Sequence, residues 1–331
     1  MDENIKRQFM THMVGTRSKK ISTVKIYISR VELFQKRYPD LDTVTRDDIA
    51  QYLTDMKIKH LKNDNTRRLS QTALISFFTW YSSKMGIKNP AVNLQPIKAY
   101  FSHPKLIHPH EIQRMIYAME QRNDDWGRRT CAVIVLLAET GIRIQEFEKL
   151  KFGNVRVEDK HFELIVPATK TNHERIVPFG AFLSGSLIEL FGKYYLWLLT
   201  QKNIKSKDPM FFQIESKRFN IQEDKSVSLT RGAVNYLLRK AAYEAGIDRV
   251  ITPHNFRHFY GTWTYKNNKD ILLLAQLMGH ADIKSTQKYV HLANMVSGDS
   301  LRKPATAGLK ASAFNTGYIE LLGDIVKNIN K

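Results

Sequence analysis

The spacing of apolar residues changes once along this 331-residue chain, and that change constrains its fold more than any other feature. Phe162, Leu164 and Val166 recur at every second position, and a second short apolar run follows. Recurrence at every second residue is typical of a strand with one buried face. We therefore expect a small antiparallel sheet between residues 155 and 179, with residues 169–173 at the tip of a hairpin. Apolar residues recur mainly at helical spacing elsewhere, so the predicted fold class is mainly α with this small antiparallel β-sheet.

Three helices are predicted in the first hundred residues. The first begins at Ser22, the second follows the predicted N-cap residue Thr45, and the third ends at Gly86. Thr45 precedes acidic residues in a first turn, which is typical of a helix start, and glycine is common where a helix ends. The three apolar stripes are Val24, Tyr27, Ile28, Val31 and Phe34, then Ile49, Leu53 and Met56, then Leu69, Leu74, Phe78 and Tyr81. Together they predict a small helical bundle.

Three prolines mark a predicted linker between two domains. Pro96, Pro104 and Pro109 fall within fifteen residues of one another. An amphipathic helix after Pro109 and a buried helix that starts at Cys131 then open the second domain. The predicted organisation is a helical domain at 1–95, a linker at 96–110, a second domain at 111–297 and a tail at 298–331.

The chain is expected to be helical from Ser184 onward, apart from a loop at 205–209 and a polar stretch at 215–228. A loose stretch follows Gly298, and a final amphipathic helix is predicted. Its apolar stripe consists of Tyr318, Leu321, Leu322, Ile325 and Ile329. The long connection would let this helix dock on another subunit, and folding back onto its own domain is the alternative.

The chain is strongly basic, with 51 Lys and Arg against 32 Asp and Glu and a formal net charge of +19. A basic protein is attracted to polyanions, above all nucleic acid, although a basic surface can also serve solubility. One basic cluster surrounds the connection between the second and third predicted helices. We interpret five of its residues as contacts to DNA phosphates, with a solvated loop as the alternative: Lys57, Lys59, Lys62, Arg67 and Arg68.

Three features bear on location. The one cysteine, Cys131, can form no internal disulfide and begins an apolar run, which suggests an inert, buried thiol. Charge from Asp2 onward argues against a secretory signal. The apolar segment from Ser186 to Thr200 is too short and too polar to span a bilayer. We therefore expect an intracellular protein.

A metal site is considered and set aside. His103, His108 and His110 lie close together in the predicted linker. No cysteine or carboxylate stands beside them at a spacing suited to a metal, so no metal is expected there.

Chemically active residue types recur in several short motifs of the second domain. Each has an ordinary explanation by itself: Arg-x-x-Glu is often a helical surface pair, a loop lysine is usually just exposed, and the chain has 14 tyrosines. Chance explains the whole set poorly. The motifs are Thr140-Gly141-Ile142-Arg143-Ile144-Gln145-Glu146, Lys170 before Arg175-Ile176-Val177-Pro178, His254-Asn255-Phe256-Arg257-His258, Met278-Gly279-His280, and Tyr289-Val290-His291.

These motifs, in this order, resemble those of the tyrosine recombinases, the group of Xer, Cre and the phage integrases. Members show Thr-Gly-x-Arg-x-x-Glu after a buried helix, a hairpin lysine before an Arg-x-Val-Pro strand, His-x-x-Arg-His, Leu-Gly-His, and a tyrosine nine residues later. The match spans residues 140–291, and the front domain resembles the family's core-binding domain. Two departures are mild: Glu139 stands where relatives often have a small or apolar residue, and His173 stands where many have a second lysine.

The resemblance implies that a DNA strand is broken without a metal or other cofactor. Arginine guanidiniums supply fixed positive charge to the non-bridging phosphate oxygens, and histidines donate hydrogen bonds or move protons. Tyr289 is the implied nucleophile, with a phenolate favoured by positive surroundings, and Lys170 protonates the leaving 5′ oxygen. Glu146 and His258 are implied to orient the arginines and pack the core. The implied catalytic set is Arg143, Lys170, His254, Arg257, His280 and Tyr289.

The resemblance further implies a two-domain, C-shaped clamp on duplex DNA, made of the core-binding domain and a catalytic domain. Four protomers would synapse two specific sites and exchange strands through a 3′-phosphotyrosyl intermediate and a Holliday junction. The tail helix would dock in a neighbour, and the protein would act in the cytoplasm on nucleoid, viral or plasmid DNA. Two alternatives are a type IB topoisomerase, which the front domain and tail disfavour, and a non-catalytic architectural protein, which the intact catalytic set disfavours. Integration, excision, dimer resolution and inversion all stay open.

Overall fold

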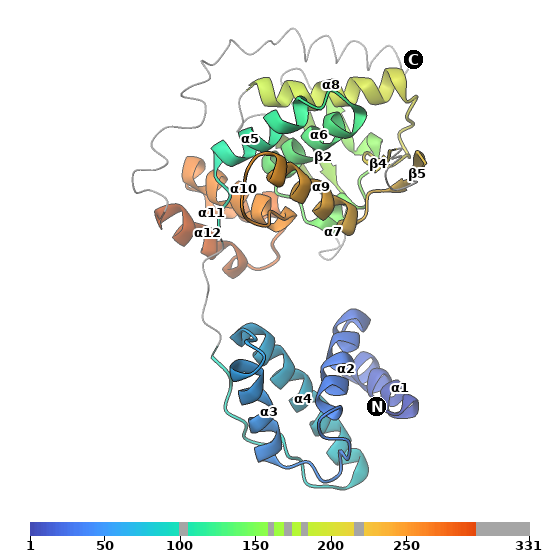
Figure 1. The fold of residues 1–331 in the computed structure, drawn as a ribbon, viewed down its shortest axis with the longest axis vertical. Coiled ribbons are helices and arrows are strands. Elements are labelled where there is room, and N and C mark those ends of the chain that lie inside the picture. Colours follow the sequence, from blue (N-terminus) through green and yellow to red (C-terminus); the bar gives the residue numbers. More distant parts are fainter. Residues whose placement is uncertain (99–104, 158–161, 169–173, 180–184, 215–221, 296–331) are drawn as a thin grey trace. The chain divides into compact units, whose positions relative to one another are not determined.

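The structure is a computed structural model, and it describes residues 1–331 except 99–104, 158–161, 169–173, 180–184, 215–221 and 296–331 (Figure 1). The chain divides into two compact units, Met1–Ser102 and His103–Lys331. The predicted tail helix and the predicted hairpin tip lie outside the described residues. No helix among the described residues is long and apolar enough to cross a membrane.

The first unit is a bundle that holds the three predicted helices: α2 (Ile21–Gln35), α3 (Arg46–Ile58) and α4 (Asp64–Met85). The Thr45 hydroxyl accepts from the Asp48 backbone N–H, while the Asp48 carboxylate accepts from the Thr45 backbone N–H at 2.9 Å. Gly86 ends α4 with φ +70°. The predicted apolar stripes form one core, together with fully buried Phe9 and Phe77.

The prediction of three helices in this unit is wrong, because the unit also contains a helix before them. A further helix, α1 (Glu3–Thr11), precedes them and continues into the π-helical turn η1 (His12–Thr16). The Asp2 carboxylate caps α1 by accepting from the backbone N–H groups of Asn4 and Ile5. Only one residue of α1, Phe9, is buried, so the helix carries too short an apolar stripe to be recognised.

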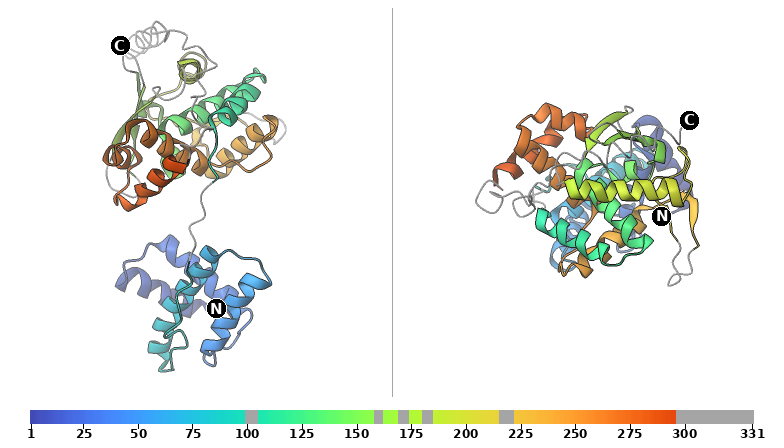
Figure 2. Two further views of the ribbon diagram at one scale, coloured as in Figure 1. Left: turned by 90° about the vertical axis from the view of Figure 1, so that its left-hand side faces the viewer. Right: turned by 90° about the horizontal axis from the view of Figure 1, so that it is seen from above.

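The second unit is built around one buried helix. Its helices are α5 (Pro109–Glu120), α6 (Asp125–Thr140), α7 (Ile144–Phe147), α8 (Gly185–Gln201), α9 (Arg231–Glu244), α10 (Pro253–Asn268), α11 (Ile271–Met278) and α12 (Lys284–Met295), with a 3₁₀ turn η2 (Phe152–Asn154). Every residue of α6 from Arg129 to Thr140 is buried. A helix that is buried on all sides needs neighbours on all sides, and α5, α8 and α10 pack against it. Figures 1 and 2 show α10, α11 and α12 grouped together, in orange to red.

The predicted antiparallel sheet is present, in the order β1 (Val155–Val157), β2 (Phe162–Val166) and β3 (Arg175–Phe179). Leu164 lies opposite Val177, and both are fully buried. This register keeps the apolar face of the sheet on the core.

A second sheet was not predicted. β4 (Phe212–Gln213) pairs antiparallel with β5 (Asp224–Ser228), where a polar stretch without a strand had been expected. No side chain of β5 is buried, and its sequence Asp-Lys-Ser-Val-Ser shows no apolar alternation. β5 is therefore a strand because it pairs with β4, and the spacing of its apolar residues does not predict it. Cys131 is buried as predicted, and burial raises the pKa of its thiol to about 12.

Candidate active site

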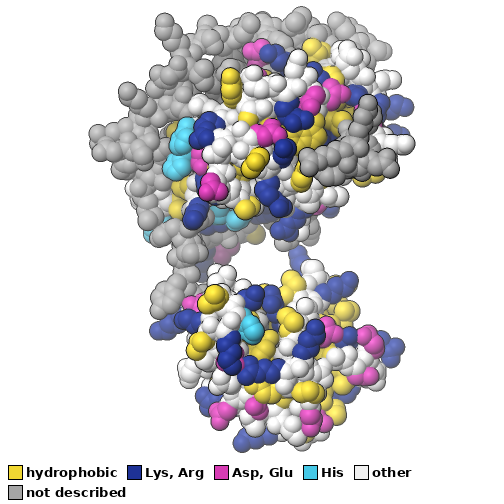
Figure 3. All heavy atoms as spheres, in the orientation of Figure 1, with side chains coloured by type: hydrophobic (Ala, Val, Ile, Leu, Met, Phe, Trp, Pro, Cys, Tyr) yellow, Lys and Arg dark blue, Asp and Glu magenta, His cyan; other side chains and the backbone are white. Residues whose placement is uncertain are grey.

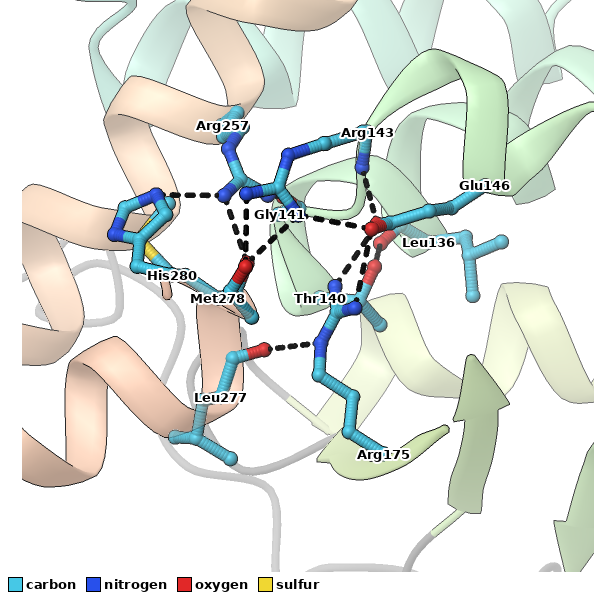
Figure 4. Close-up of polar contacts among 11 residues, drawn as sticks. Leu136, Thr140, Gly141, Arg143, Glu146, Arg175, Arg257, Leu277, Met278 and His280 are labelled. Atoms are coloured by element: carbon cyan, nitrogen blue, oxygen red, sulfur yellow. Dashed lines mark hydrogen bonds and ion pairs between the residues drawn. The ribbon is translucent and has the colours of Figure 1, made fainter. Parts of the chain in front are cut away.

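Three chain segments that are distant in sequence meet beside α6 (Figure 4). Arg143 follows the glycine that ends α6, the His254 and Arg257 pair lies in the first turns of α10, and His280 and Tyr289 come from the end of α11 and from α12. The contact between α10 and α12 is among the largest in this unit. The structure thus brings together five of the six predicted catalytic residues, and the sixth, Lys170, lies outside the described residues.

The C-terminal end of α11 holds the arginines. The last carbonyls of a helix have no partners within it, and here guanidiniums supply them. The Leu277 carbonyl accepts from Arg175 Nε at 2.8 Å, and the Gly279 carbonyl accepts from Arg143 Nη2 at 2.9 Å. The Met278 carbonyl, between them, accepts from both Arg143 Nη1 at 3.2 Å and Arg257 Nη2 at 2.8 Å. Guanidiniums from the N-cap of α7, from β3 and from α10 are therefore fixed on one helix end.

Glu146 fixes two of these arginines in turn. Its carboxylate accepts from the Arg143 backbone N–H at 2.8 Å and from Arg143 Nη1 at 2.9 Å. The same carboxylate accepts from Arg175 Nη1 at 3.1 Å and Nη2 at 2.9 Å. Burial acts to raise the pKa of Glu146, but the two guanidiniums outweigh burial and hold the pKa below its usual value. Glu146 is therefore an ionised anchor for both arginines.

Arg175 was not predicted as a site residue. It was noted only as the first residue of a strand, and the Arg-x-Val-Pro motif was the signal that could have drawn attention to it. Its guanidinium also explains Gly279: a Cβ there would lie 2.8 Å from Arg175 Nη1, and the φ of +60° favours glycine as well.

Arg257 is almost fully buried, so its positive charge lies inside the protein. Its Nη1 donates to the Gly141 carbonyl at 2.7 Å, in addition to the bond to Met278. Burial, followed by the repulsion of Arg143, lowers the pKa of Arg257 to about 10, so it stays protonated at neutral pH. No carboxylate within the described part of the chain forms an ion pair with it. Among the described residues, the partners of this buried guanidinium are carbonyls and an imidazole, an arrangement that suits an anionic ligand.

His280 is held neutral in one tautomer. Arg257 Nη2 lies 2.9 Å from His280 Nε2, and a guanidinium can only donate, so Nε2 accepts. The ring proton is then on Nδ1, which donates to Thr286 Oγ1 at 2.7 Å. Burial, Arg257 and Arg143 lower the pKa of His280 to about 3. Thr286 is fully buried and was not predicted; nothing in its sequence context marked it.

Tyr289 is fully buried beside this cluster. Its ring lies parallel to that of His280, with centroids 6.3 Å apart, and 5.8 Å from that of His258. Burial raises its pKa to about 12, while Arg257 and Arg143 act to lower it. The expectation that positive surroundings favour the phenolate therefore holds for the direction of the arginines' effect, but burial outweighs them.

Two histidines of α10 extend the site, and one of them, His258, lies against Tyr289. The rings of His254 and His258 are 4.2 Å apart, and His254 is the exposed one. Burial, His254 and then the half-buried Lys288 lower the pKa of His258 to about 3. Lys288 also lowers the pKa values of His254 and His280, after desolvation. It was not predicted as a site residue.

Gly261 leaves room for the Tyr289 ring. A Cβ at Gly261 would lie 2.6 Å from Tyr289 Cε1 and 2.7 Å from Cδ1. We predict that Gly261→Ala displaces the ring and slows covalent attack on DNA by on the order of 10²-fold, the cost of moving a reacting group by about 1 Å. Gly232→Ala, in α9, is the control, because its Cβ would meet nothing closer than 3.7 Å. Adduct formation by Gly261→Ala at the rate of the control would contradict this prediction.

The predicted DNA-binding cluster lies in the first unit, around the start of α4. Lys57, Lys59, Lys62 and Arg68 are exposed. Arg67 instead holds α4 to α3: its Nε donates to the Leu53 carbonyl at 2.9 Å and its Nη1 to Asp64 at 2.5 Å. Figure 3 shows Lys and Arg side chains, in dark blue, on the visible face of each unit.

The described residues contain no cluster of three His, Cys, Asp or Glu side chains that could hold a metal ion. The rings of His108 and His110 stack with centroids 5.5 Å apart, and His103 lies outside the described residues.

Comparison with known proteins gives a consistent result. The sequence profile of the phage integrase family matches residues 105–295. Tyrosine recombinase XerC of Listeria welshimeri is 26% identical over 294 residues, which cover 87% of this chain and 93% of that protein. Tyrosine recombinase XerD of Listeria innocua is 26% identical over 295 residues, with the same coverage.

Solved structures share the fold. The post-cleavage complex of XerH site-specific recombinase with palindromic difH substrate has a TM-score of 0.63 at 17% identity, and covers 88% of this chain and 82% of that one. A lambda integrase dimer bound to a COC′ core site has a TM-score of 0.63 at 19% identity, with coverage of 86% and 76%.

Proposed function

Since this chain belongs to the phage integrase family, we propose that it is a site-specific DNA recombinase. It cleaves and rejoins DNA strands through a 3′-phosphotyrosyl intermediate and exchanges them through a Holliday junction. One observation carries the proposal: Arg143 and Arg257, from separate elements, share the Met278 carbonyl beside the buried ring of Tyr289. Guanidiniums fixed in this way are suited to a phosphate that gains negative charge during the reaction.

The reaction follows from these positions. The Tyr289 phenolate oxygen attacks the phosphorus. A bond forms between that oxygen and the phosphorus of the 3′ phosphate, and the bond between the phosphorus and the 5′ oxygen breaks. A guanidinium has five N–H groups, and the contacts of Arg143 and Arg257 to the described residues use three on each. The remaining N–H groups bind the non-bridging oxygens. The 5′ oxygen takes a proton as it leaves, and rejoining is the reverse of these steps.

Proton transfer is needed both when Tyr289 attacks and when the 5′ oxygen leaves. Tyr289 must lose one, and its pKa of about 12 makes that loss costly until the phosphate and its cations are in place. His280 accepts a hydrogen bond at Nε2 from Arg257 and carries its ring proton on Nδ1, so it can donate to phosphate only after Arg257 turns away and Nε2 gains a proton. His254, exposed at the start of α10, is free of that restriction.

Lys170 is proposed as the acid for the leaving 5′ oxygen. We predict that Lys170→Ala slows cleavage by on the order of 10²-fold, as expected for the loss of a general acid. A substrate with a sulfur at the 5′ bridging position should largely restore the rate, because a thiolate leaves without a proton. If the sulfur substrate is cleaved as slowly as the ordinary one, Lys170 is not the acid, and His173 and Lys160 become the residues to test.

The decisive experiment uses a DNA duplex with a nick close to the cleavage site. When an active enzyme cleaves this duplex, the short strand that carries the new 5′ hydroxyl dissociates. Rejoining is then impossible, and the enzyme stays trapped on the DNA as a covalent adduct. A non-catalytic DNA-binding protein forms no adduct. A type IB topoisomerase would be trapped but would not join strands of two different duplexes, so strand exchange between two labelled sites separates that alternative.

The partners proposed are double-stranded DNA with specific sites and further copies of this chain. One structure of the same fold is a lambda integrase tetramer bound to a Holliday junction, which supports a tetramer on two sites. Docking of the predicted tail helix in a neighbouring subunit stays a proposal, and so does action in the cytoplasm, where DNA is accessible.

The basic cluster of the first unit is proposed to contact DNA phosphates. Replacing Lys57, Lys62 and Arg68 by Gln should weaken binding and make it less dependent on salt. Each phosphate contact contributes about 0.9 to the slope of log affinity against log salt. Gln at Lys36, an exposed lysine at the end of α2, serves as the control. If the slope of the triple variant is unchanged, these side chains are solvated and do not contact DNA phosphates.

A further inference from the structure

We propose that Lys288 is a further phosphate-binding cation of the active site, which neutralises the scissile phosphate as it gains charge. The inference rests on the proposed recombinase function and adds one residue to its chemistry.

Lys288 lies against the nucleophile. Its Nζ is 4.9 Å from the centroid of the Tyr289 ring, and its side chain is half-buried. Its charge lowers the pKa values of His254, His258 and His280, and the rings of His258 and His280 lie against Tyr289. Arg257 and Arg143 in turn repel the ammonium and, after burial, lower its pKa. Lys288 thus faces the same space as the two arginines.

No carboxylate among the described residues forms an ion pair with Lys288. Two other partly buried lysines of this unit do have acidic partners: Lys202 lies 2.6 Å from Glu223, and Lys240 lies 3.0 Å from Glu244. In the active site, the carboxylate of Glu146 is already shared by Arg143 and Arg175. Lys288 therefore adds positive charge that the neighbouring ion pairs do not balance.

A half-buried ammonium beside other cations has a cost, which an anionic ligand removes. A phosphodiester carries one negative charge, and the transition state concentrates more charge on its non-bridging oxygens. An ammonium is a compact charge that can approach one oxygen without the planar geometry that a guanidinium requires. The surplus charge of Lys288 thus fits a group that becomes more anionic as the reaction proceeds.

Two other roles would place Lys288 here. Its ammonium and stem could merely hold the Tyr289 ring, or the ammonium could protonate the leaving 5′ oxygen. Substitutions that remove the charge and keep the aliphatic stem, together with a substrate whose leaving group needs no proton, separate these two roles from phosphate binding.

The test separates charge from packing. Lys288→Met keeps the aliphatic stem over Tyr289 and removes the charge, and Lys288→Arg keeps the charge. Lys284→Met, at the exposed first position of the same helix, is the matched control. Single-turnover adduct formation is measured on three substrates: ordinary DNA, DNA with an uncharged methylphosphonate at the scissile position, and DNA with a 5′ bridging sulfur.

On ordinary DNA we expect Lys288→Met to react on the order of 10²-fold more slowly than Lys284→Met, as for the loss of one oxyanion donor. Lys288→Arg should recover most of this loss. On the methylphosphonate the ratio between the two methionine variants should fall several-fold, since one negative charge is gone.

Three results would overturn the proposal. An equal ratio on ordinary DNA and on the methylphosphonate assigns Lys288 to packing, and rescue confined to the sulfur substrate makes it the leaving-group acid. An unchanged rate for Lys288→Met gives it no part in the reaction. The unsubstituted protein's adduct on nicked DNA tests the recombinase function separately, so the two failures are distinguishable.

Discussion

Tyr289→Phe is expected to bind its DNA site with nearly the affinity of the unsubstituted protein and to form no covalent adduct with it. The substitution removes one oxygen from a fully buried ring and leaves the ring's contacts with His280 and His258 in place. No hydrogen bond of good geometry reaches that hydroxyl from the described residues, so its loss leaves no donor or acceptor unpaired. Folding and binding should therefore be preserved while the nucleophile is lost.

Adducts are measured on a denaturing gel with the nicked substrate, and affinity is measured by gel shift. Tyr260→Phe is the matched control, since Tyr260 is another buried tyrosine of this unit, in α10, whose ring lies against Gly141. That control should still form the adduct. A persistent adduct in Tyr289→Phe would move the nucleophile to another tyrosine.

Arg143→Ala and Arg257→Ala should each slow cleavage by on the order of 10²–10³-fold, as expected when one oxyanion-stabilising donor is lost. Arg257 also holds His280 Nε2 and the Gly141 carbonyl, so its removal disturbs more of the site than removal of Arg143. Chelation of metal ions should change the rate little, since side chains supply the positive charge. The measurement is single-turnover cleavage with and without chelator.

A control distinguishes lost charge from lost structure. Arg249 donates to Glu111 and to the Leu106 carbonyl elsewhere in the same unit, so Arg249→Ala removes a comparable structural contact away from the site. Thermal stability should fall in that variant without a specific loss of cleavage. Cleavage by Arg257→Ala at the rate of Arg249→Ala, or a strict need for Mg²⁺, would refute the side-chain mechanism.

The sequence predicted those features that a local pattern encodes. The capping of α3 by Thr45 depends on residues within one turn, and the sheet register depends on alternation such as that of Leu164. The motifs also predicted that Arg143, Arg257 and Tyr289 belong to one site, which the fold brings together.

Other features depend on neighbours that no local pattern identifies. The short helix α1 has a single buried residue, and β5 exists because β4 pairs with it. Thr286 fixes the tautomer of His280 through one hydrogen bond between side chains six residues apart. The burial of Tyr289, which reverses the expected direction of its pKa, follows from the packing of α12 on α10.

The end of α11 has a consequence for how the site is switched. Its three final carbonyls are the negative pole of a short helix, and all three are occupied by guanidiniums from other elements. A shift of α11 by about 1 Å would therefore misplace Arg143, Arg175 and Arg257 in one step. Losses from single substitutions will not add, because the three side chains share one support. A neighbouring subunit that moves this helix would therefore switch cleavage on or off through the three arginines together, without contacting the nucleophile.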